Sequence, residues 1–258
     1  MPPSRFFIER TMRLYENNDF HTISDPLVLE VPMKIVVNGR NLATLACSPE
    51  AFEELAVGFL ISEGLLSGTD KVNKITVDQN TVYIELDCLP EAQTKEEGRF
   101  INTCSGRGLQ SDPISQPIPM CDNGYRFSAQ NLLHLITSLD ETSFTFQRTG
   151  GVHSAALGWG SELLIRYEDI GRHNAVDKVF GRAYLNHVPL YDKCLLLSGR
   201  IAAEIVSKAL RHGVSLVVSR SAPTLRAVEL AEASGMTIVG FARGKRFNTY
   251  CHWERIIL

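Results

Sequence analysis

Apolar and polar residues alternate with a period of two in two stretches of the first ninety residues, which indicates β-strands with one buried face. In the first stretch, 27–46, the dipeptide Asn38-Gly39 separates two alternating runs, a pattern typical of a β-hairpin. The second stretch, 74–87, predicts further strand structure. Between them, apolar residues recur at helical spacing, and we expect a helix that is capped by Ser48 and ended by Gly64.

The pattern disappears in residues 90–125, which contain several glycines and prolines. Long irregular segments of compact domains are usually functional or disordered, so this segment is a candidate for function. From Ser128 onward, helical periods and short apolar strands alternate. The expected strands are 155–158, 162–167, 194–198, 215–219 and 237–242, and the expected helices are 128–137, 174–185, 202–210 and 224–233.

This order of elements predicts an α/β fold class, with α+β character over the whole chain. Residues 126–258 are expected to form a three-layer α/β/α domain around a mostly parallel sheet. Residues 1–125 are expected to form a smaller mixed N-terminal domain that ends in a flexible cysteine-bearing loop, at about 90–125. The first 25 residues show no pattern that indicates a function.

The composition is that of an ordinary soluble globular protein, with 44% apolar residues, 21% charged residues and a net charge of −3. Because there is no overall positive charge, we expect no nucleic-acid partner. The apolar stretches are too short to cross a membrane, and the N-terminal residues lack the apolar core of a secretory signal. We therefore expect a cytoplasmic protein that does not bind membranes.

Six cysteines stand at positions 47, 88, 104, 121, 194 and 251, and no two of them have C-x-x-C spacing. This argues against a zinc site and against a thioredoxin-type dithiol, so we expect no protein-ligated metal. In a reducing cytosol most cysteines are free thiols buried as small apolar residues.

Cys104 is the cysteine for which we expect a chemical role. It is followed by Gly106 and Gly108, which allow backbone N–H groups to point at an anion. Arg107 supplies a positive charge that lowers the pKa of a nearby thiol. These surroundings suit a nucleophilic or persulfide-carrying cysteine. The alternative is a loop cysteine without a role.

His153 follows a double glycine and precedes an expected strand. Zinc deaminases carry an H-x-E motif at such a place and a P-C-x-x-C motif later in the chain. Here Ala155 stands at the glutamate position and the second motif is absent, so zinc hydrolysis is not supported. A structural, hydrogen-bonded histidine and a catalytic one both stay open.

Polar side chains crowd residues 167–178, at the start of an expected helix. We expect Asn174 or Asp169 to cap this helix, which places Arg172 and His173 at its N-terminus, where anions bind. The alternative is a solvated charged turn. The density of different polar groups favours a ligand site.

Polar turns also follow three expected strands, and ligands of open α/β sheets bind at the carboxyl ends of strands. Serine, glycine and arginine in the first two turns suit phosphate, and cations in the third can hold a pyrophosphate beside a ring that stacks on a base. Taken singly, the third turn reads equally as an exposed basic hairpin. Together the turns favour one polyanionic ligand along the sheet edge. Their residues are Ser198 and Arg200, Ser219 and Arg220, and Phe241, Ala242, Arg243, Gly244, Lys245 and Arg246.

Several long runs carry a family resemblance. They are Glu53-Glu-Leu-Ala-Val-Gly-Phe-Leu-Ile-Ser-Glu-Gly64, Gly150-Gly-Val-His-Ser-Ala-Ala156, Glu168-Asp-Ile-Gly-Arg-His-Asn-Ala-Val-Asp-Lys178, Leu197-Ser-Gly-Arg-Ile201, Ser219-Arg-Ser-Ala-Pro-Thr224 and Gly240-Phe-Ala-Arg-Gly244. With these runs the chain resembles the formate dehydrogenase accessory sulfurtransferase family (FdhD) over roughly residues 28–255.

The resemblance implies a C-terminal domain similar to the cytidine deaminase fold without its zinc site. It also implies a sulfurtransferase in which Cys104 takes persulfide sulfur from a cysteine desulfurase. The sulfur passes to the bis-molybdopterin guanine dinucleotide form of the molybdenum cofactor, which formate dehydrogenase requires. The family's cofactor-binding stretch falls on residues 241–246. Members commonly have a second loop cysteine where this chain has Arg107, so Cys104 works alone unless Cys121 substitutes.

Two other functions compete with this one. A chaperone would bind and deliver the same molybdenum cofactor without sulfur chemistry. A nucleotide hydrolase of the deaminase type is disfavoured by Ala155 and by the missing cysteine pair. Because deaminase-like folds often dimerise, we expect a homodimer.

Overall fold

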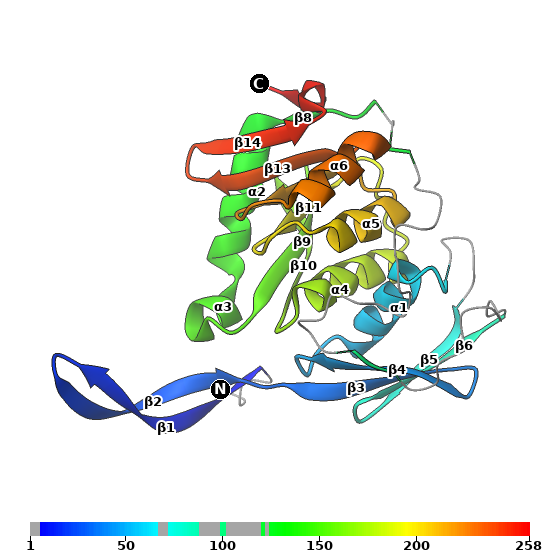
Figure 1. Cartoon of the computed structure of the whole chain (residues 1–258). Coiled ribbons are helices and arrows are strands. Elements are labelled where there is room, and N and C mark those ends of the chain that lie inside the picture. The colour runs from blue at the N-terminus through cyan, green and yellow to red at the C-terminus, as the bar shows by residue number, and fades with distance from the viewer. Residues whose placement is uncertain (1–5, 67–71, 88–98, 102–119, 122–123) are drawn as a thin grey trace.

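A computed structural model describes residues 6–66, 72–87, 99–101, 120–121 and 124–258, without the side chains of 99–101. Cys88, Cys104 and Arg107 lie outside the described residues. Two large sheets with separate hydrophobic cores are present, and a two-stranded arm projects from them (Figure 1). No helix in the described ranges is long and apolar enough to cross a membrane.

The N-terminal sheet has the strand order β5-β6-β3-β4-β7. The predicted hairpin is confirmed, and Asn38 and Gly39 at its turn both have the positive φ angles that tight hairpins require. The stretch 74–87 holds parts of two strands, because the chain turns at Gln79 with a φ of 51°. A short strand also lies inside the segment predicted to be irregular. The strands are β3 (Val31–Val37), β4 (Arg40–Cys47), β5 (Val72–Asp78), β6 (Thr81–Leu86) and β7 (Arg99–Ile101).

Helix α1 (Phe52–Ser62) follows β4, but Ser48 does not cap it, so that prediction was wrong. The helix instead starts after Ala51, whose backbone is left-handed with a φ of 55°. Ser48 is buried and bonds to the C-terminal half of the chain. Its N–H donates to Asp169 Oδ2 (3.1 Å), and its Oγ accepts from the Ile170 N–H (3.1 Å).

The C-terminal sheet has the order β10-β9-β11-β12-β13-β14. Only β11/β12 and β12/β13 pair in parallel, whereas β10/β9, β9/β11 and β13/β14 pair antiparallel, so the expected mostly parallel sheet was wrong. Short turns force β9/β10 and β13/β14 to run antiparallel, and only strands joined through helices run parallel. The strands are β9 (His153–Trp159), β10 (Glu162–Asp169), β11 (Cys194–Leu197), β12 (Leu216–Ser219), β13 (Thr237–Arg243) and β14 (Arg246–Cys251).

Helices cover both faces of this sheet, which confirms the predicted three-layer arrangement (Figure 1). One face packs on α4, α5 and α6, and the other packs on α2. The chain returns near its end to pair β15 with β8. The elements are β8 (Phe127–Ser128), α2 (Ala129–Thr142), α3 (Phe144–Thr149), α4 (Arg172–Leu185), α5 (Ala203–Arg211), α6 (Leu225–Ser234), the 3-10 helix η2 (Trp253–Arg255) and β15 (Ile256–Ile257).

Helices α1 and α4 connect the two large cores. Their backbones touch because glycines stand at the crossing: Gly58 of α1 lies against the Asp177 carbonyl, and Gly181 of α4 lies against the Glu54 carbonyl. At the end of α4, Tyr184 packs on the N-terminal core. The division of the chain into domains at residue 125 stays a prediction.

Ion pairs surround this crossing. Asp177 of α4 is buried, accepts from Ser62 Oγ of α1 (2.6 Å) and pairs with Lys208 Nζ of α5 (2.5 Å). Burial raises the pKa of Asp177, and the Lys208 charge opposes that rise. Glu54 of α1 pairs with Arg182 Nη2 of α4 (2.5 Å). Three helices are therefore cross-linked by polar groups around the glycine contact.

The arm consists of β1 (Phe7–Glu16) and β2 (Asp19–Val28), which pair antiparallel along their whole length. At its base, the Val28 side chain packs on Gly151, and Glu9 pairs with Arg148 of α3 (3.2 Å). Beyond the base, the arm projects away from the rest of the chain (Figure 1). No element had been expected in the first 25 residues.

We expect Gly58→Ala to destabilise the protein. Alanine stabilises an open helix relative to glycine, but here the new Cβ would overlap the Asp177 carbonyl and force α1 and α4 apart. The free energy of unfolding, measured by chemical denaturation, should fall by about 3 kcal/mol. The control is Glu53→Ala on the exposed side of α1, which should change it by less than about 1 kcal/mol. A stabilised Gly58→Ala variant would contradict the close crossing.

Candidate functional site

One edge of the C-terminal sheet gathers the residues singled out from the sequence. Because β9 runs antiparallel to both β10 and β11, the start of β9 meets the ends of β10, β11, β12 and β13 there. In the register, His153 lies opposite Asp169, and Leu197 lies opposite Ser219. The role of these residues as ligand contacts stays a prediction. The residues at or just beyond this edge are His153, Arg172, His173, Ser198, Arg200, Ser219, Arg220, Phe241, Ala242, Arg243, Gly244, Lys245 and Arg246.

The two histidines at the edge are neutral at pH 7. Burial lowers the pKa of His153, and the charge of Arg172 lowers it further. Burial and the Lys208 charge lower the pKa of His173 to about 3. The neutral His173 ring accepts a hydrogen bond at Nε2 from Arg172 Nε (3.4 Å). The positive charge of this edge therefore comes from arginine and lysine.

The serine hydroxyls at the strand ends hold the turns in place. Ser219 is buried; its Oγ donates to the Gly199 carbonyl (2.6 Å) and accepts from the Ser221 N–H (2.9 Å). Ser198 Oγ accepts from the Ser154 N–H (2.9 Å). These bonds stabilise the turns after β11 and β12. We therefore infer that both hydroxyls position the turns and do not themselves contact a ligand.

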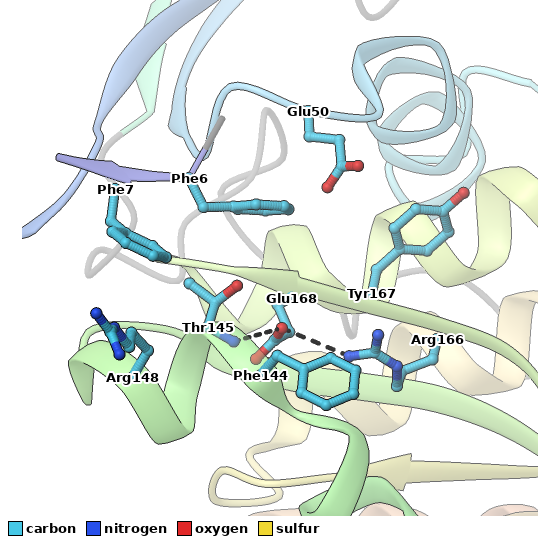
Figure 2. Close-up of a pocket in the computed structure, with 9 residues that line it drawn as sticks. All are labelled: Phe6, Phe7, Glu50, Phe144, Thr145, Arg148, Arg166, Tyr167 and Glu168. Atoms are coloured by element: carbon cyan, nitrogen blue, oxygen red, sulfur yellow. Dashed lines mark hydrogen bonds and ion pairs between the residues drawn. The ribbon is translucent and has the colours of Figure 1, made fainter. Parts of the chain in front are cut away.

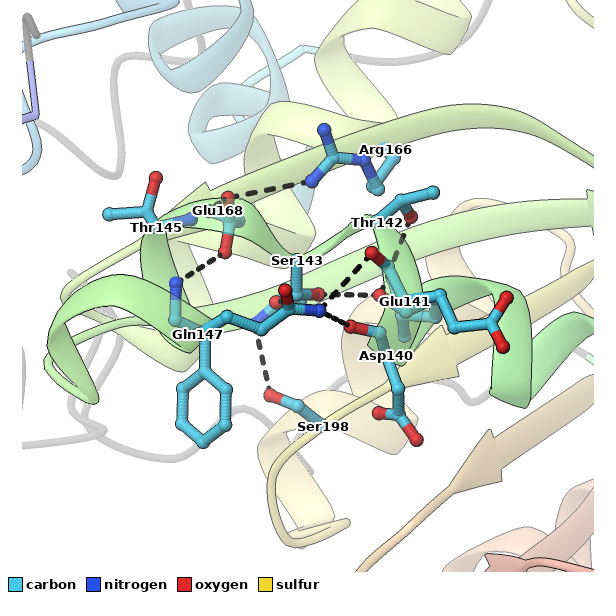
Figure 3. A network of polar contacts seen from close by, with 12 residues as sticks. Asp140, Glu141, Thr142, Ser143, Thr145, Gln147, Arg166, Glu168 and Ser198 are labelled. Carbon is cyan, nitrogen blue, oxygen red and sulfur yellow. Dashed lines mark hydrogen bonds and ion pairs between the residues drawn. The ribbon is translucent and has the colours of Figure 1, made fainter.

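The end of α2 contacts the same edge, which the sequence pattern did not indicate. Arg220 Nη1 pairs with Asp140 Oδ1 (2.9 Å), and burial raises the pKa of Asp140 while Arg220 opposes the rise. Ser143 Oγ donates to Ser154 Oγ (2.7 Å), and Gln147 Nε2 donates to the Asp140 carbonyl (2.6 Å). Figure 3 shows the hydrogen bonds of Ser143 and Gln147 at the junction of α2 and α3.

The tip of the β13–β14 hairpin carries the basic run. Phe241 has a φ of 53°, a strained conformation for a residue with a side chain, and its N–H donates to the Ser221 carbonyl (3.1 Å). The Arg243 guanidinium lies 5.8 Å from the centre of the Phe241 ring. Ala242 is buried in the core under α2, so only its backbone can face a ligand. The exposed cations of this edge are Arg200, Arg243, Lys245 and Arg246.

A buried ion pair under the edge was missed. Lys178 Nζ lies 2.6 Å from Asp169 Oδ2, and both side chains are fully buried. Asp169 Oδ1 accepts from the Gly171 N–H (2.9 Å) and from Asn174 Nδ2 (2.9 Å). Neither Asp169 nor Asn174 caps α4, whose N-cap is Gly171, so the predicted cap was wrong. Lys178 stands on the apolar face of an expected helix, and this position in the sequence could have indicated a buried carboxylate partner.

Four of the six cysteines are buried and lie in the described residues: 47, 121, 194 and 251. Burial raises the pKa of all four thiols, to about 12 for Cys47 and Cys194. Cys121 Sγ donates to the Val214 carbonyl (3.5 Å), and its N–H donates to the Ser234 carbonyl (2.8 Å), at the sheet edge opposite the cations. In this position Cys121 offers no exposed second thiol.

A separate cavity of about 550 Å³ lies between the start of β1, helix α3 and strand β10 (Figure 2). Glu168 in its floor accepts from the N–H groups of Thr145 (3.1 Å) and Phe146 (3.0 Å) and lies 3.4 Å from Arg166 Nη1. Its carboxylate thus caps the start of α3. None of the residues predicted for the ligand site lines this cavity. In the described part of the chain, no group of His, Cys, Asp or Glu side chains is arranged to hold a metal ion.

Comparisons with known proteins agree on one family. The model of the FdhD/NarQ family matches residues 28–257. Relatives named "Sulfur carrier protein FdhD" include one from Bacillus pumilus, 40% identical over 96% of this chain and 97% of its own length. Another, from Bacillus subtilis, is 38% identical over 94% of each chain. A solved structure described as "a putative formate dehydrogenase accessory protein from Desulfotalea psychrophila" has a TM-score of 0.81 at 24% identity, covers 98% of this chain and 100% of its own, and supports the fold.

We expect the four buried thiols to resist alkylation in the native protein. Their raised pKa values leave little thiolate, and packing excludes the reagent. Iodoacetamide treatment at pH 8, followed by peptide mass spectrometry, should leave positions 47, 121, 194 and 251 unmodified. The same four should react after unfolding in guanidinium chloride. Rapid native modification of Cys121 would contradict its placement in the core.

Proposed function

Because this chain belongs to the FdhD/NarQ family, we propose that it is a sulfur carrier that serves formate dehydrogenase. In this proposal Cys104 receives sulfur from a cysteine desulfurase. The sulfur then passes to bis-molybdopterin guanine dinucleotide molybdenum cofactor, which is bound as a substrate. The likeness of the C-terminal domain to cytidine deaminases belongs to the same proposal.

The observation that carries the proposal is the set of cations at one edge of the C-terminal sheet. Arg172, Arg200 and Arg220 follow β10, β11 and β12, and Arg243 and Arg246 stand at the β13–β14 tip. A dinucleotide cofactor carries pyrophosphate groups, and guanidinium groups bind phosphate through paired charge-assisted hydrogen bonds. The start of α4 adds its helix dipole beside Arg172.

The ring of Phe241 supplies a surface for a guanine base. Its strained backbone holds it at the end of β13, and Arg243 lies over the ring. Stacking of a base between an aromatic ring and a guanidinium is a common mode of nucleotide recognition. Ala242 and Ser219 contribute through their backbone, since their side chains are buried.

Sulfur transfer in this proposal begins at Cys104. The Cys104 thiolate attacks the outer sulfur of the donor persulfide; a new S–S bond forms, the donor S–S bond breaks, and the donor cysteine leaves as thiolate. Four of the six thiols are buried, which leaves Cys88 and Cys104 as candidates and supports this assignment. Only Cys104 has glycines and an arginine directly after it.

The competing candidate is a chaperone that binds the molybdenum cofactor and delivers it without sulfur chemistry. The presence of Arg107 where family members commonly have a second cysteine favours that reading, because a two-thiol release is then unavailable in the loop. Both candidates use the same cationic edge. They differ in whether Cys104 becomes a persulfide.

We expect a persulfide on Cys104 after incubation with a cysteine desulfurase and cysteine. Intact-mass spectrometry should show an added sulfur atom, about 32 Da, that a reductant removes. Cys104→Ala should abolish the adduct, whereas Cys88→Ala should retain it. A protein that binds guanine nucleotide but never gains this mass would leave the chaperone as the function.

We expect Arg243→Ala and Arg246→Ala each to weaken GDP binding by about tenfold, because each removes a charge-assisted phosphate contact. Isothermal titration calorimetry measures the affinity. The matched control is Arg40→Ala, which removes an exposed arginine from the start of β4 in the N-terminal sheet. Unchanged affinity in both site variants would remove the hairpin tip from the binding site.

A further inference from the structure

Strand β10 is an edge strand of the C-terminal sheet: among the described strands it pairs with β9 and with no other. In β9, the Ser154 carbonyl accepts from the N–H that follows β11 (3.0 Å), so the Ser154 backbone points away from β10. Backbone groups alternate in direction along a strand, so Ala155 points toward β10 and pairs with Tyr167, its partner in the register. The backbone N–H and C=O groups of Arg166 and Glu168, on either side of Tyr167, therefore point outward from the sheet.

The outward groups of β10 are open to another chain. In the ranges that the structure describes, no residue bonds to the backbone N–H or C=O groups of Arg166 and Glu168 on this side. The cavity of about 550 Å³ lies here, because residues 166–168 all line it, and its volume is in the range of known ligand pockets, roughly 300–1,000 Å³. An open strand edge of this kind is a template for pairing with a further strand.

The cavity has two different walls, because successive side chains of β10 point to opposite faces of the sheet. The Tyr167 hydroxyl accepts from Arg182 Nε (2.9 Å) and donates to Glu54 (3.2 Å), which leaves the Tyr167 ring to one wall of the cavity. The Phe144 ring belongs to the opposite wall. In Figure 2 the upper wall consists of Phe6, Glu50 and Tyr167, and the lower wall consists of Phe144, Arg166 and Glu168.

Each wall offers one charge to a ligand. No described residue forms an ion pair or hydrogen bond with the Glu50 side chain on the upper wall. On the lower wall, Arg166 Nη1 is the one guanidinium nitrogen that bonds to a described residue, Glu168 at 3.4 Å, so the others are open. The Glu168 carboxylate is already occupied by two N–H groups of α3. A complementary ligand thus brings a positive charge to Glu50 and a negative charge to Arg166.

From these observations we propose that β10 binds an extended peptide segment of a partner protein, which adds to the sheet as a further strand. Antiparallel pairing is the more stable arrangement. Residues paired across strands share a face, so the segment has a basic residue opposite Tyr167 and an acidic residue opposite Arg166. An apolar residue opposite Glu168 lies on the wall of Phe144. From its N-terminus, the segment therefore reads apolar, basic, acidic.

Antiparallel pairing also assigns the backbone bonds of the segment. Its apolar and acidic residues exchange N–H and C=O bonds with Glu168 and Arg166, whereas the N–H of its basic residue points away from β10. The stem of the basic residue lies on the Tyr167 ring, and its charged end reaches Glu50. This contact is independent of the sulfur-carrier function, because it uses neither Cys104 nor the cations of the other site.

Fluorescence anisotropy of the full chain with a labelled, end-blocked peptide Thr-Val-Lys-Glu-Val-Thr tests the proposal. This peptide should bind at least about tenfold more tightly than Thr-Val-Glu-Lys-Val-Thr, which has the same composition but places like charges at Glu50 and Arg166. Equal affinity for the two peptides, or no binding of the first, would overturn the proposal.

N-methylated peptides test strand addition separately from recognition of the side chains. Methylation of the glutamate nitrogen removes a donor that points to β10 and should weaken binding by about tenfold or more. Methylation of the lysine nitrogen, which points away, should change the affinity by less than about threefold. Two methylated peptides of equal affinity would show that the peptide does not add to β10 as a strand.

A charge swap in the protein separates the contact from a folding defect. Glu50→Lys should weaken binding of Thr-Val-Lys-Glu-Val-Thr by about tenfold and should bind Thr-Val-Glu-Glu-Val-Thr more tightly than the wild type does. The matched control is Glu53→Lys, an equal change at an exposed residue of α1 that does not line the cavity, and it should bind both peptides like the wild type. A Glu50→Lys variant with wild-type affinity for both peptides would remove Glu50 from the contact and overturn the proposal.

Discussion

The close contact of α1 and α4 holds the rest of the structure in place. Gly58 and Gly181 let the two helix backbones touch, so no side chain separates the helices. Helix α4 also packs on the C-terminal sheet through Val179 and Phe180, and on the N-terminal core through Tyr184. A change in the distance between α1 and α4 would therefore disturb both cores at once.

Buried charges beside this contact fix the position of the start of α4 relative to the turn before α1. A buried carboxylate without a partner costs several kcal/mol, and removing one member of a buried pair costs about 3–5 kcal/mol. Asp169 meets this cost through Lys178, through the Gly171 and Ser48 N–H groups and through Asn174. Because these partners come from the turn before α1 and from the start of α4, the carboxylate fixes one against the other. The start of α4 is where Arg172 and His173 enter the candidate site, so the α1–α4 contact also sets the site geometry.

Local patterns predicted much of the fold, and pairing between distant segments explains the remainder. Hydrophobic periodicity located the Asn38-Gly39 hairpin and the helices α2, α4, α5 and α6, because these depend on neighbouring residues, but it missed the short helix α3. It did not show that β9 and β10 pair antiparallel at one side of the sheet, since strand direction depends on which strands pair. The caps expected at Ser48 and Asn174 failed for a similar reason: both side chains bond to residues distant in the sequence, Ser48 to the Ile170 N–H and Asn174 to the Ala46 carbonyl. The arm was missed because apolar residues stand on both of its faces, so its two strands show no regular alternation of apolar and polar positions.

The positions of the thiols constrain how sulfur can leave the protein. Release of a persulfide as sulfide requires two electrons, which a second thiol supplies when it forms a disulfide with the first. Arg107 removes the neighbouring thiol from the loop, and Cys121 is held in the core at the opposite edge of the sheet. Cys47, Cys194 and Cys251 are buried with raised pKa values. If Cys104 carries sulfur, the electrons for release as sulfide therefore come from Cys88 or from a group outside this chain.

Direct transfer of the sulfane sulfur to a bound acceptor avoids that requirement, because the acceptor takes the sulfur and Cys104 returns to its thiolate. A chain with a single loop cysteine thus favours an acceptor bound within reach of that cysteine over release into solvent.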